Sequence, residues 1–196
     1  MKMFTVALIA IVVVVAAVAL RPRIARADLL KEGQIAPPFT TQMVTGETEA
    51  PVSLADFHGK KVILYFYPKD ETSGCTKEAC AFRDGYARYT NAGLVVLGCS
   101  IDSAEAHKDF IRKNGLPFPL LLDPGKKIAT AYGAANGIPI LGLDRRITYV
   151  IDENGKVLKV YPSVDPSTHA IEILNDLGVA NAAPPAPASP AAPASN

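Results

Sequence analysis

The chain alternates short apolar runs with segments of helix-forming residues. Residues 62–67 and 94–99 are continuous aliphatic and aromatic runs of strand length, which is typical of strands buried on both faces. Between them, helix-forming residues begin at Thr76 and predict one helix that reaches about Tyr89. A strand, a helix and a second strand in this order predict a right-handed parallel crossover.

Weaker patterns predict further elements on both sides of this crossover. Residues 39–41 and 51–54, parted by Thr45-Gly46-Glu47, indicate an N-terminal hairpin. The other predicted elements are a helix with a capping box at 102–105 that ends at 114–115, a strand at 118–122, a short helix at 123–132, a hairpin of strands 146–151 and 156–161, and a last helix at 166–177. This order predicts an α/β fold whose mixed central sheet is flanked by helices. The sheet is expected to be parallel in the middle and antiparallel at one edge, with the N-terminal hairpin as an extension.

The N-terminus carries a membrane-targeting pattern. Residues 3–20 are an almost unbroken apolar run behind Lys2, so residues 1–27 are excluded from the folded domain as a signal peptide or membrane anchor. The small-x-small pattern at 25–27 fits a cleavage site and predicts export of a domain that begins at Asp28. The alternative is an uncleaved anchor, because three arginines follow the run and such residues favour the cytoplasmic side.

Composition and charge limit the remaining function classes. The chain has 196 residues, of which 49% are hydrophobic and 20% charged, enough for one well-cored domain that we place at residues 28–179. A net charge of +1 without a basic block argues against nucleic acid as a partner. Residues 180–196 are almost entirely Ala, Pro and Ser and predict a disordered tail, because they cannot bury a core.

Two cysteines follow the first buried strand and carry the candidate chemistry. Residues 68–74 are predicted to form a turn, so Cys75 falls at or near the first turn of the next helix, where free N–H groups and the helix dipole favour a thiolate. Cys80 comes five residues later. In a helix, that spacing separates the two residues by roughly 7.5 Å of rise and about 140° of rotation. If both cysteines lie in the helix, a disulfide between them requires the helix to unwind locally.

The remaining cysteine and the histidines show no catalytic pattern. Cys99 lies in an aliphatic strand and is expected to be inert core. The three histidines have no metal-ligand or triad spacing, so we expect them to be solvated: His58, His107 and His169. Three cysteines, two of them close together, do not form a structural disulfide framework.

The residues around the cysteines resemble a known family. Pro68-x-x-x-Thr72-x-x-Cys75 resembles the peroxidatic motif of peroxiredoxins, and residues 72–84 are similar to the peroxiredoxin Q (bacterioferritin comigratory protein) branch. Two segments that precede the first buried strand, residues 33–39 and 54–60, are similar to the corresponding segments of the same family. The resemblance implies a thioredoxin-like fold, in which Cys75 is the peroxidatic and Cys80 the resolving cysteine.

The same resemblance implies roles for two further residues. Thr72 would hydrogen-bond the peroxide. An arginine that opens a strand of the form Arg-x-Thr-Phe-Val-Ile-Asp would complete the site, and Arg146 fits this pattern better than Arg145, with Tyr149 in place of Phe. The structural alternatives are an N-cap role for Thr72, a surface ion pair for Arg146 and a packing role for Cys80.

The resemblance implies reduction of hydrogen peroxide or organic hydroperoxides, with a thioredoxin-type reductant and without a metal, flavin or haem cofactor. Members of this branch are often monomeric. The main alternative is a membrane-tethered copper carrier of thioredoxin fold, but such carriers use Cys-x-x-x-Cys, whereas four residues separate Cys75 from Cys80. A general thiol-disulfide oxidoreductase would need Cys-x-x-Cys.

Overall fold

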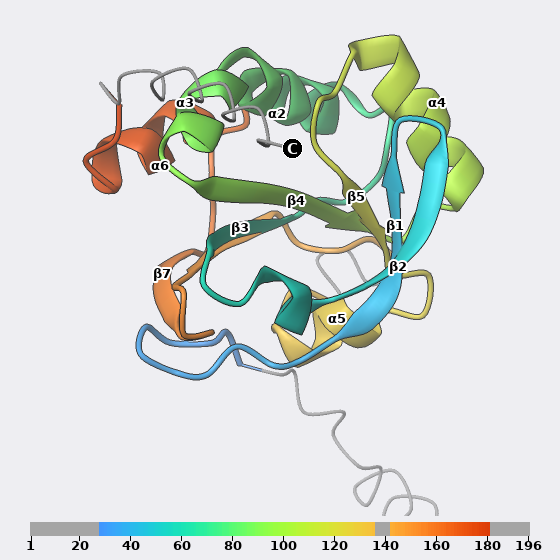
Figure 1. Ribbon diagram of the computed structural model, residues 1–196. Helices are drawn as coiled ribbons and strands as arrows, with labels where there is room; N and C mark the ends of the chain where they lie inside the picture. The colour runs from blue at the N-terminus through green and yellow to red at the C-terminus, as the bar shows by residue number, and fades with distance from the viewer. Residues whose placement is uncertain (1–27, 136–141, 181–196) are drawn as a thin grey trace, which may run out of the picture.

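The computed structural model describes residues 28–135 and 142–180 (Figure 1). The predicted targeting segment at 1–27, the predicted tail from 181 onward and part of the loop at 133–143 lie outside the described residues. No helix within the described ranges is long and apolar enough to span a membrane.

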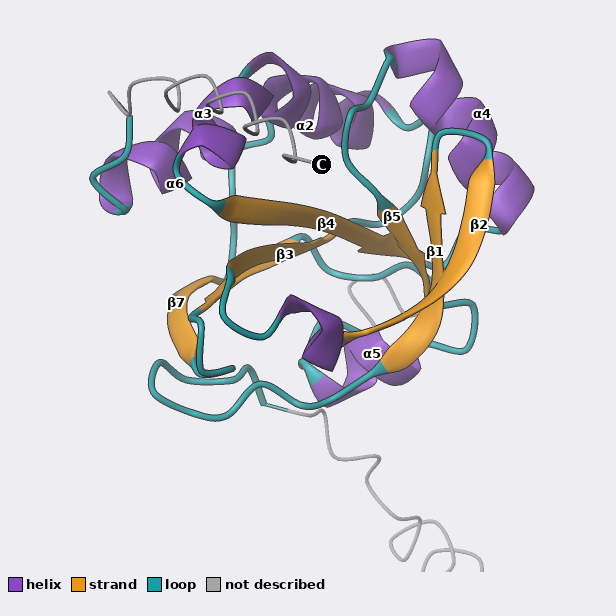
Figure 2. Cartoon of the chain, in the orientation of Figure 1, coloured by secondary structure: helices purple, strands orange, loops and turns teal. Residues whose placement is uncertain are grey.

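A mixed sheet of seven strands forms the centre of the described chain (Figure 2). The strands are β1 Thr40–Thr45, β2 Thr48–Ser53, β3 Lys61–Phe66, β4 Leu94–Ser100, β5 Leu120–Leu122, β6 Ile147–Ile151 and β7 Val157–Tyr161. Their order in the sheet is β2-β1-β5-β4-β3-β6-β7. The pairs β3–β4 and β4–β5 are parallel, which confirms the predicted crossover.

The prediction of antiparallel pairing at only one edge was wrong. The β6–β7 hairpin pairs antiparallel with β3, as expected, but the β1–β2 hairpin also joins the sheet, through antiparallel pairing of β1 with β5. This pairing satisfies the backbone groups that the short strand β5 would otherwise expose at a sheet edge. The N-terminal hairpin is therefore part of the sheet.

Helices cover both faces of the sheet. They are the short 3-10 helix η1 Leu54–Phe57 and the α-helices α2 Ser73–Asp84, α3 Tyr86–Asn91, α4 Ala104–Asn114, α5 Lys127–Ala131 and α6 His169–Asp176. Helices α2, α3, α4 and α6 lie on one face, and η1 and α5 lie on the other (Figure 1). Each face has its own apolar cluster, so β3 and β4 are buried on both sides, as their continuous apolar runs predicted.

The helix predicted from Thr76 to about Tyr89 is in fact two helices. Helix α2 ends at Asp84, and Gly85 separates it from α3. A glycine is the weakest ordinary helix former, and a Cβ at this position would lie 3.3 Å from the Tyr89 ring. The absence of a Cβ at Gly85 therefore lets the Tyr89 ring pack closely against the backbone.

Helix α4 ends at Asn114, where predicted, with Gly115 in the left-handed conformation at φ 59°. The capping box predicted at 102–105 does not form. The N-cap is Ser103, whose side chain accepts from the Ala106 N–H, and an alanine at this position cannot complete a capping box. Asp102 is instead buried and accepts other hydrogen bonds.

Two more helices start later than predicted, because turns precede them. A backbone turn from Asp123 to Lys126 comes before α5, and the Asp165 side chain accepts from Ser167 in a turn before α6.

Candidate active site

Cys75 is held where β3 delivers the chain to α2. It is the third residue of α2, and only 1% of it is exposed. Cys75, Ala79 and Phe82 lie on the face of α2 that packs toward the sheet, since their spacing repeats at helical period. The first helical hydrogen bond runs from Thr76 to Thr72, so the N–H groups of the first turn remain free around the thiol.

The register of the sheet brings Arg146 to this thiol. Phe66 at the end of β3 pairs with Ile147 at the start of β6, so Arg146 lies just beyond the end of β3, where α2 begins. Its Nη2 donates to Cys75 Sγ at 3.3 Å. Arg145 points elsewhere and approaches the Gly133 carbonyl. The structure therefore places Arg146, and not Arg145, beside Cys75.

Glu78 completes the surroundings of Arg146, and the sequence analysis missed it. Nη1 of Arg146 donates to Glu78 Oε2, so one guanidinium contacts both the carboxyl and the thiol. Glu78 is fully buried, and burial raises its pKa to about 7, against the opposing effect of Arg146. The available signal was its position three residues after Cys75, on the same helical face as Ala79 and Phe82.

Glu78 and Cys75 in turn act on the arginine. Burial of Arg146 disfavours its charge, but Glu78 and Cys75 outweigh this effect, so the pKa of Arg146 is raised. Its side chain is 18% exposed, which leaves a polar cation at the edge of the site. This cation can bind a small molecule that approaches Cys75.

Thr72 and Pro68 belong to the loop between β3 and α2. Pro68 opens this loop and is partly exposed. Thr72 is the N-cap residue by position, but its hydroxyl donates to the Lys69 carbonyl at 3.0 Å and does not cap the helix. Because its hydrogen is used there, the lone pairs of the hydroxyl remain free to accept.

Gly74 leaves room for the guanidinium. A Cβ at this position would lie 3.2 Å from Arg146 Nη2 and 3.8 Å from Pro166 Cγ, in the loop before α6. A side chain at position 74 would therefore press on the arginine that contacts the thiol.

Cys80 lies on another side of α2. Its thiol is partly buried and donates to Oδ1 of Asn114 at 3.9 Å, and the Asn114 carbonyl accepts from Arg83 at 2.7 Å. Cys75 and Cys80 are both free thiols within the same continuous helix. Both cysteines thus lie in the helix, so a disulfide between them would require α2 to open.

The expectation of solvated histidines was wrong for two of the three. His58 is exposed, but His107 and His169 are fully buried. His107 contacts Asp70, and His169 contacts Thr148 at 2.8 Å, so partners from distant segments replace water. Burial lowers the pKa of His169. No group of three or more His, Cys, Asp or Glu side chains within 28–135 and 142–180 is arranged to hold a metal ion.

Cys99 lies in the core, as expected. It is fully buried in β4, and burial raises the pKa of its thiol well above the ordinary value. A thiol that stays protonated is a poor nucleophile. Cys99 is therefore a weaker candidate nucleophile than the cysteines of α2.

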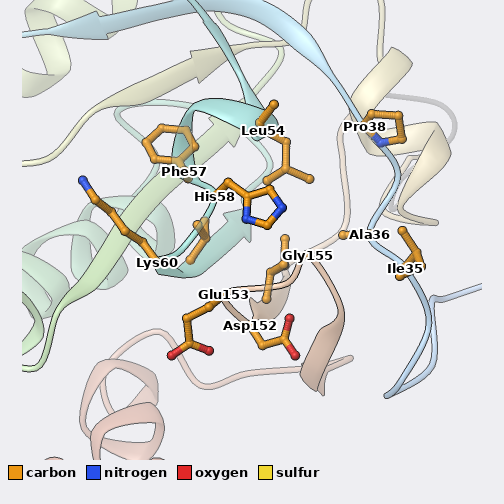
Figure 3. A pocket seen from close by; sticks show the side chains of 13 residues that line it. Ile35, Ala36, Pro38, Leu54, Phe57, His58, Lys60, Asp152, Glu153 and Gly155 are labelled. Carbon is orange, nitrogen blue, oxygen red and sulfur yellow. The ribbon is translucent and has the colours of Figure 1, made fainter.

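Figure 3 shows an apolar pocket of about 270 Å³, and none of these cysteines lines it. Its lining comes from the segment at 35–38, from η1 and from the turn between β6 and β7, and includes Leu54 and Phe57. Neither Cys75 nor Arg146 lines it. The pocket is therefore separate from the candidate active site.

Comparisons with known proteins agree on one family. A model of the AhpC/TSA family matches residues 33–160. The chain is 47% identical to a chloroplastic peroxiredoxin Q of Sedum lineare, over 73% of this chain and 75% of that protein. It is 45% identical to a putative peroxiredoxin bcp of Coxiella burnetii, over 76% of this chain and 99% of that protein.

Solved structures agree with the fold. The peroxidoxin BcpB of Mycobacterium tuberculosis superposes with a TM-score of 0.68 at 31% identity, over 76% of this chain and 97% of its own. A structure of Xanthomonas campestris peroxiredoxin Q gives a TM-score of 0.66 at 28% identity, over 81% of this chain and 100% of its own. These matches confirm the predicted thioredoxin-like α/β fold.

Proposed function

The chain belongs to the AhpC/TSA family and is a peroxiredoxin, and from this premise we propose that it reduces hydrogen peroxide and small organic hydroperoxides through two cysteines. Cys75 is the peroxidatic cysteine and Cys80 the resolving cysteine. The observation that carries the proposal is the buried Cys75 thiol at the start of α2, 3.3 Å from the Arg146 guanidinium. A copper carrier is not favoured, because the relatives are peroxiredoxins and a guanidinium beside the thiol repels a metal cation.

In the first step, the Cys75 thiolate attacks the O–H oxygen of the hydroperoxide. The S–O bond forms as the O–O bond breaks, so Cys75 becomes a sulfenic acid and an alkoxide or hydroxide leaves and takes a proton from solvent. Arg146 and the free N–H groups of the first turn stabilise the charge on the leaving oxygen. The free lone pairs of the Thr72 hydroxyl can accept the peroxide O–H.

In the second step, α2 opens and Cys80 reaches the sulfenic acid. The Cys80 sulfur attacks the Cys75 sulfur, a disulfide forms and water leaves. The Cys80 contact with Asn114 must break for this to happen. A dithiol reductant of thioredoxin type then returns two electrons by thiol-disulfide exchange and restores both thiols.

The test is a non-reducing tryptic map of the reduced protein after one equivalent of hydrogen peroxide, with remaining thiols blocked. Trypsin cleaves after Lys69, Lys77 and Arg83, so a Cys75–Cys80 disulfide joins the peptides 70–77 and 78–83. We expect this joined pair within seconds. Two unreacted thiols would refute the peroxidase proposal.

The Cys80→Ser variant is the matched control. It should lose the joined pair while Cys75 still oxidises to a sulfenic or sulfinic acid. If the joined pair is absent from the unsubstituted protein but Cys75 carries sulfinic acid, Cys80 is not the resolving cysteine. Titration of the reduced protein with Cu(I) tests the alternative carrier.

We also propose that the domain works outside the cytoplasm, as a monomer. The proposal of export rests on the apolar run at 3–20 and the small-x-small pattern at 25–27. An N-terminus at Asp28 in protein from the native host would support it, and an intact N-terminus would favour a membrane anchor. Light scattering tests the monomer. An exported enzyme would need an electron donor other than cytoplasmic thioredoxin.

A further inference from the structure

A buried hydrogen bond between Asp70 and His107 holds the loop between β3 and α2, and the proposed reaction steps do not use it. Asp70 lies in this loop and is 5% exposed, and His107 in α4 is fully buried. His107 Nδ1 lies 2.7 Å from Asp70 Oδ2. The other carboxylate oxygen of Asp70 accepts from the Tyr67 hydroxyl at 2.7 Å. Both oxygens of Asp70 are therefore engaged by groups outside α2.

His107 also contacts a second segment. Its other ring nitrogen, Nε2, lies 3.3 Å from the Leu121 carbonyl oxygen in β5. His107 therefore contacts both β5 and the loop, and its hydrogen bond with Asp70 is buried between α4 and the loop.

The backbone of the same loop is held by a separate hydrogen bond, and one of its residues is strained. The Asp70 N–H donates to Asp102 Oδ2 at 2.8 Å, and the Ser100 hydroxyl donates to the same oxygen at 2.7 Å. Glu71, the next residue, has φ 62°, a left-handed conformation that non-glycine residues rarely adopt. Such a residue persists only where the surrounding contacts determine its conformation. The Asp70 contacts supply this constraint immediately before Thr72 and Cys75.

We propose that Asp70 and His107 are positioning residues for the peroxide reaction: their buried hydrogen bond fixes the loop so that the Cys75 thiol and the Thr72 hydroxyl meet the substrate at Arg146. This inference rests on the proposed function. Neither residue touches the reacting atoms. They act through the backbone, since Asp70 lies five residues before Cys75 and two before Thr72. Small misplacements of reacting groups cause large losses of rate.

The test compares the Cys80→Ser parent with the same protein carrying Asp70→Ala and His107→Leu. The double substitution removes both polar side chains, so neither is left buried without the other. The measurement is the second-order rate constant for oxidation of Cys75 by hydrogen peroxide, followed by quenching, dimedone trapping and mass spectrometry. We expect a folded protein by circular dichroism whose rate constant is lower by about tenfold or more.

Two further variants separate positioning from general stability. Ile151→Ala removes core volume on the other face of the sheet, in the cluster that excludes α2 and α4. It should lower the melting temperature and leave the rate constant unchanged. His107→Gln keeps an N–H donor toward Asp70 and should recover most of the lost rate.

The outcomes are distinct. A folded double variant with the parent's rate constant overturns the inference, as does a loss of rate in Ile151→Ala that matches its loss of stability. If the double variant does not fold, Asp70→Asn takes its place, because it keeps the volume and the bond from Tyr67 but puts an amide N–H donor where Oδ2 contacts His107. A loss of about threefold or more is then expected, and an unchanged rate overturns the inference. If the parent does not react with peroxide, the proposed function fails and the inference fails with it.

Discussion

Replacing Glu78 with Gln should remove a pH dependence of folding stability that this one carboxyl creates. Glu78 is fully buried, and burial raises its pKa from the ordinary value of 4.5 to about 7, although Arg146 opposes the shift. Between these pH values, the folded protein keeps a proton that the unfolded chain has released. The free energy of unfolding therefore falls as the pH rises through this window.

The magnitude follows from the two pKa values. Each pKa unit corresponds to about 1.36 kcal/mol, so the rise from 4.5 to about 7 corresponds to about 3 kcal/mol between pH 4.5 and pH 8. Glu78→Gln has no proton to lose, and its amide has nearly the same volume. The unsubstituted protein should therefore lose about 3 kcal/mol relative to the variant over this range.

The assay is urea unfolding of both reduced proteins at several pH values between 4.5 and 8, followed by circular dichroism. The difference between the two free energies of unfolding is the useful quantity, because the other titrating groups contribute equally to both proteins and cancel. Parallel curves, with a constant difference across the range, would refute the reasoning. They would show that the Arg146 ion pair keeps Glu78 ionised despite its burial.

Three other changes test the site and its support. Arg146→Ala should slow oxidation of Cys75 by about 100-fold in single-turnover experiments, because one aimed donor is lost, while Arg145→Ala should not; equal effects would contradict the assignment. Gly74→Ala should slow the same step by about tenfold without loss of melting temperature, because its Cβ would lie 3.2 Å from the guanidinium; an unchanged rate would mean that the arginine moves freely. Burial lowers the pKa of His169, so the unfolded chain binds a proton first as the pH falls below about 6.5, and stability falls with it. His169→Gln should flatten that decline in urea titrations, and a decline of equal slope would exclude His169 as its source.

Local patterns determined much of the fold and the centre of the site. Continuous apolar runs identified β3 and β4, because a strand with helices on both faces has no polar face to show. The helix formers after Gly74 placed Cys75 at the start of a helix, and the cysteine spacing by itself implied that a disulfide between Cys75 and Cys80 would require this helix to open. These conclusions concern neighbours along the chain, where backbone geometry is nearly fixed.

The place of Arg146 could be predicted only in part from the sequence. Its place beside Cys75 was expected only through the resemblance of its strand to a family pattern. The physical reason is the antiparallel register of β3 with β6, which brings together residues 71 positions apart. No local sequence pattern indicates which residues of β3 and β6 pair with each other.

Tertiary structure alone decided the polar contacts that support the site. Glu78 looked like an ordinary helix former until α2 packed on the sheet and buried its carboxyl against Arg146. His107 looked solvated because its partner Asp70 lies 37 residues earlier. A polar side chain is buried only where the fold supplies a hydrogen-bond partner that replaces water. The residues next to it in the sequence do not indicate which distant residue that partner is. The sequence thus determined the candidate thiol and its helix, and the packing of distant segments determined which polar side chains hold them in place.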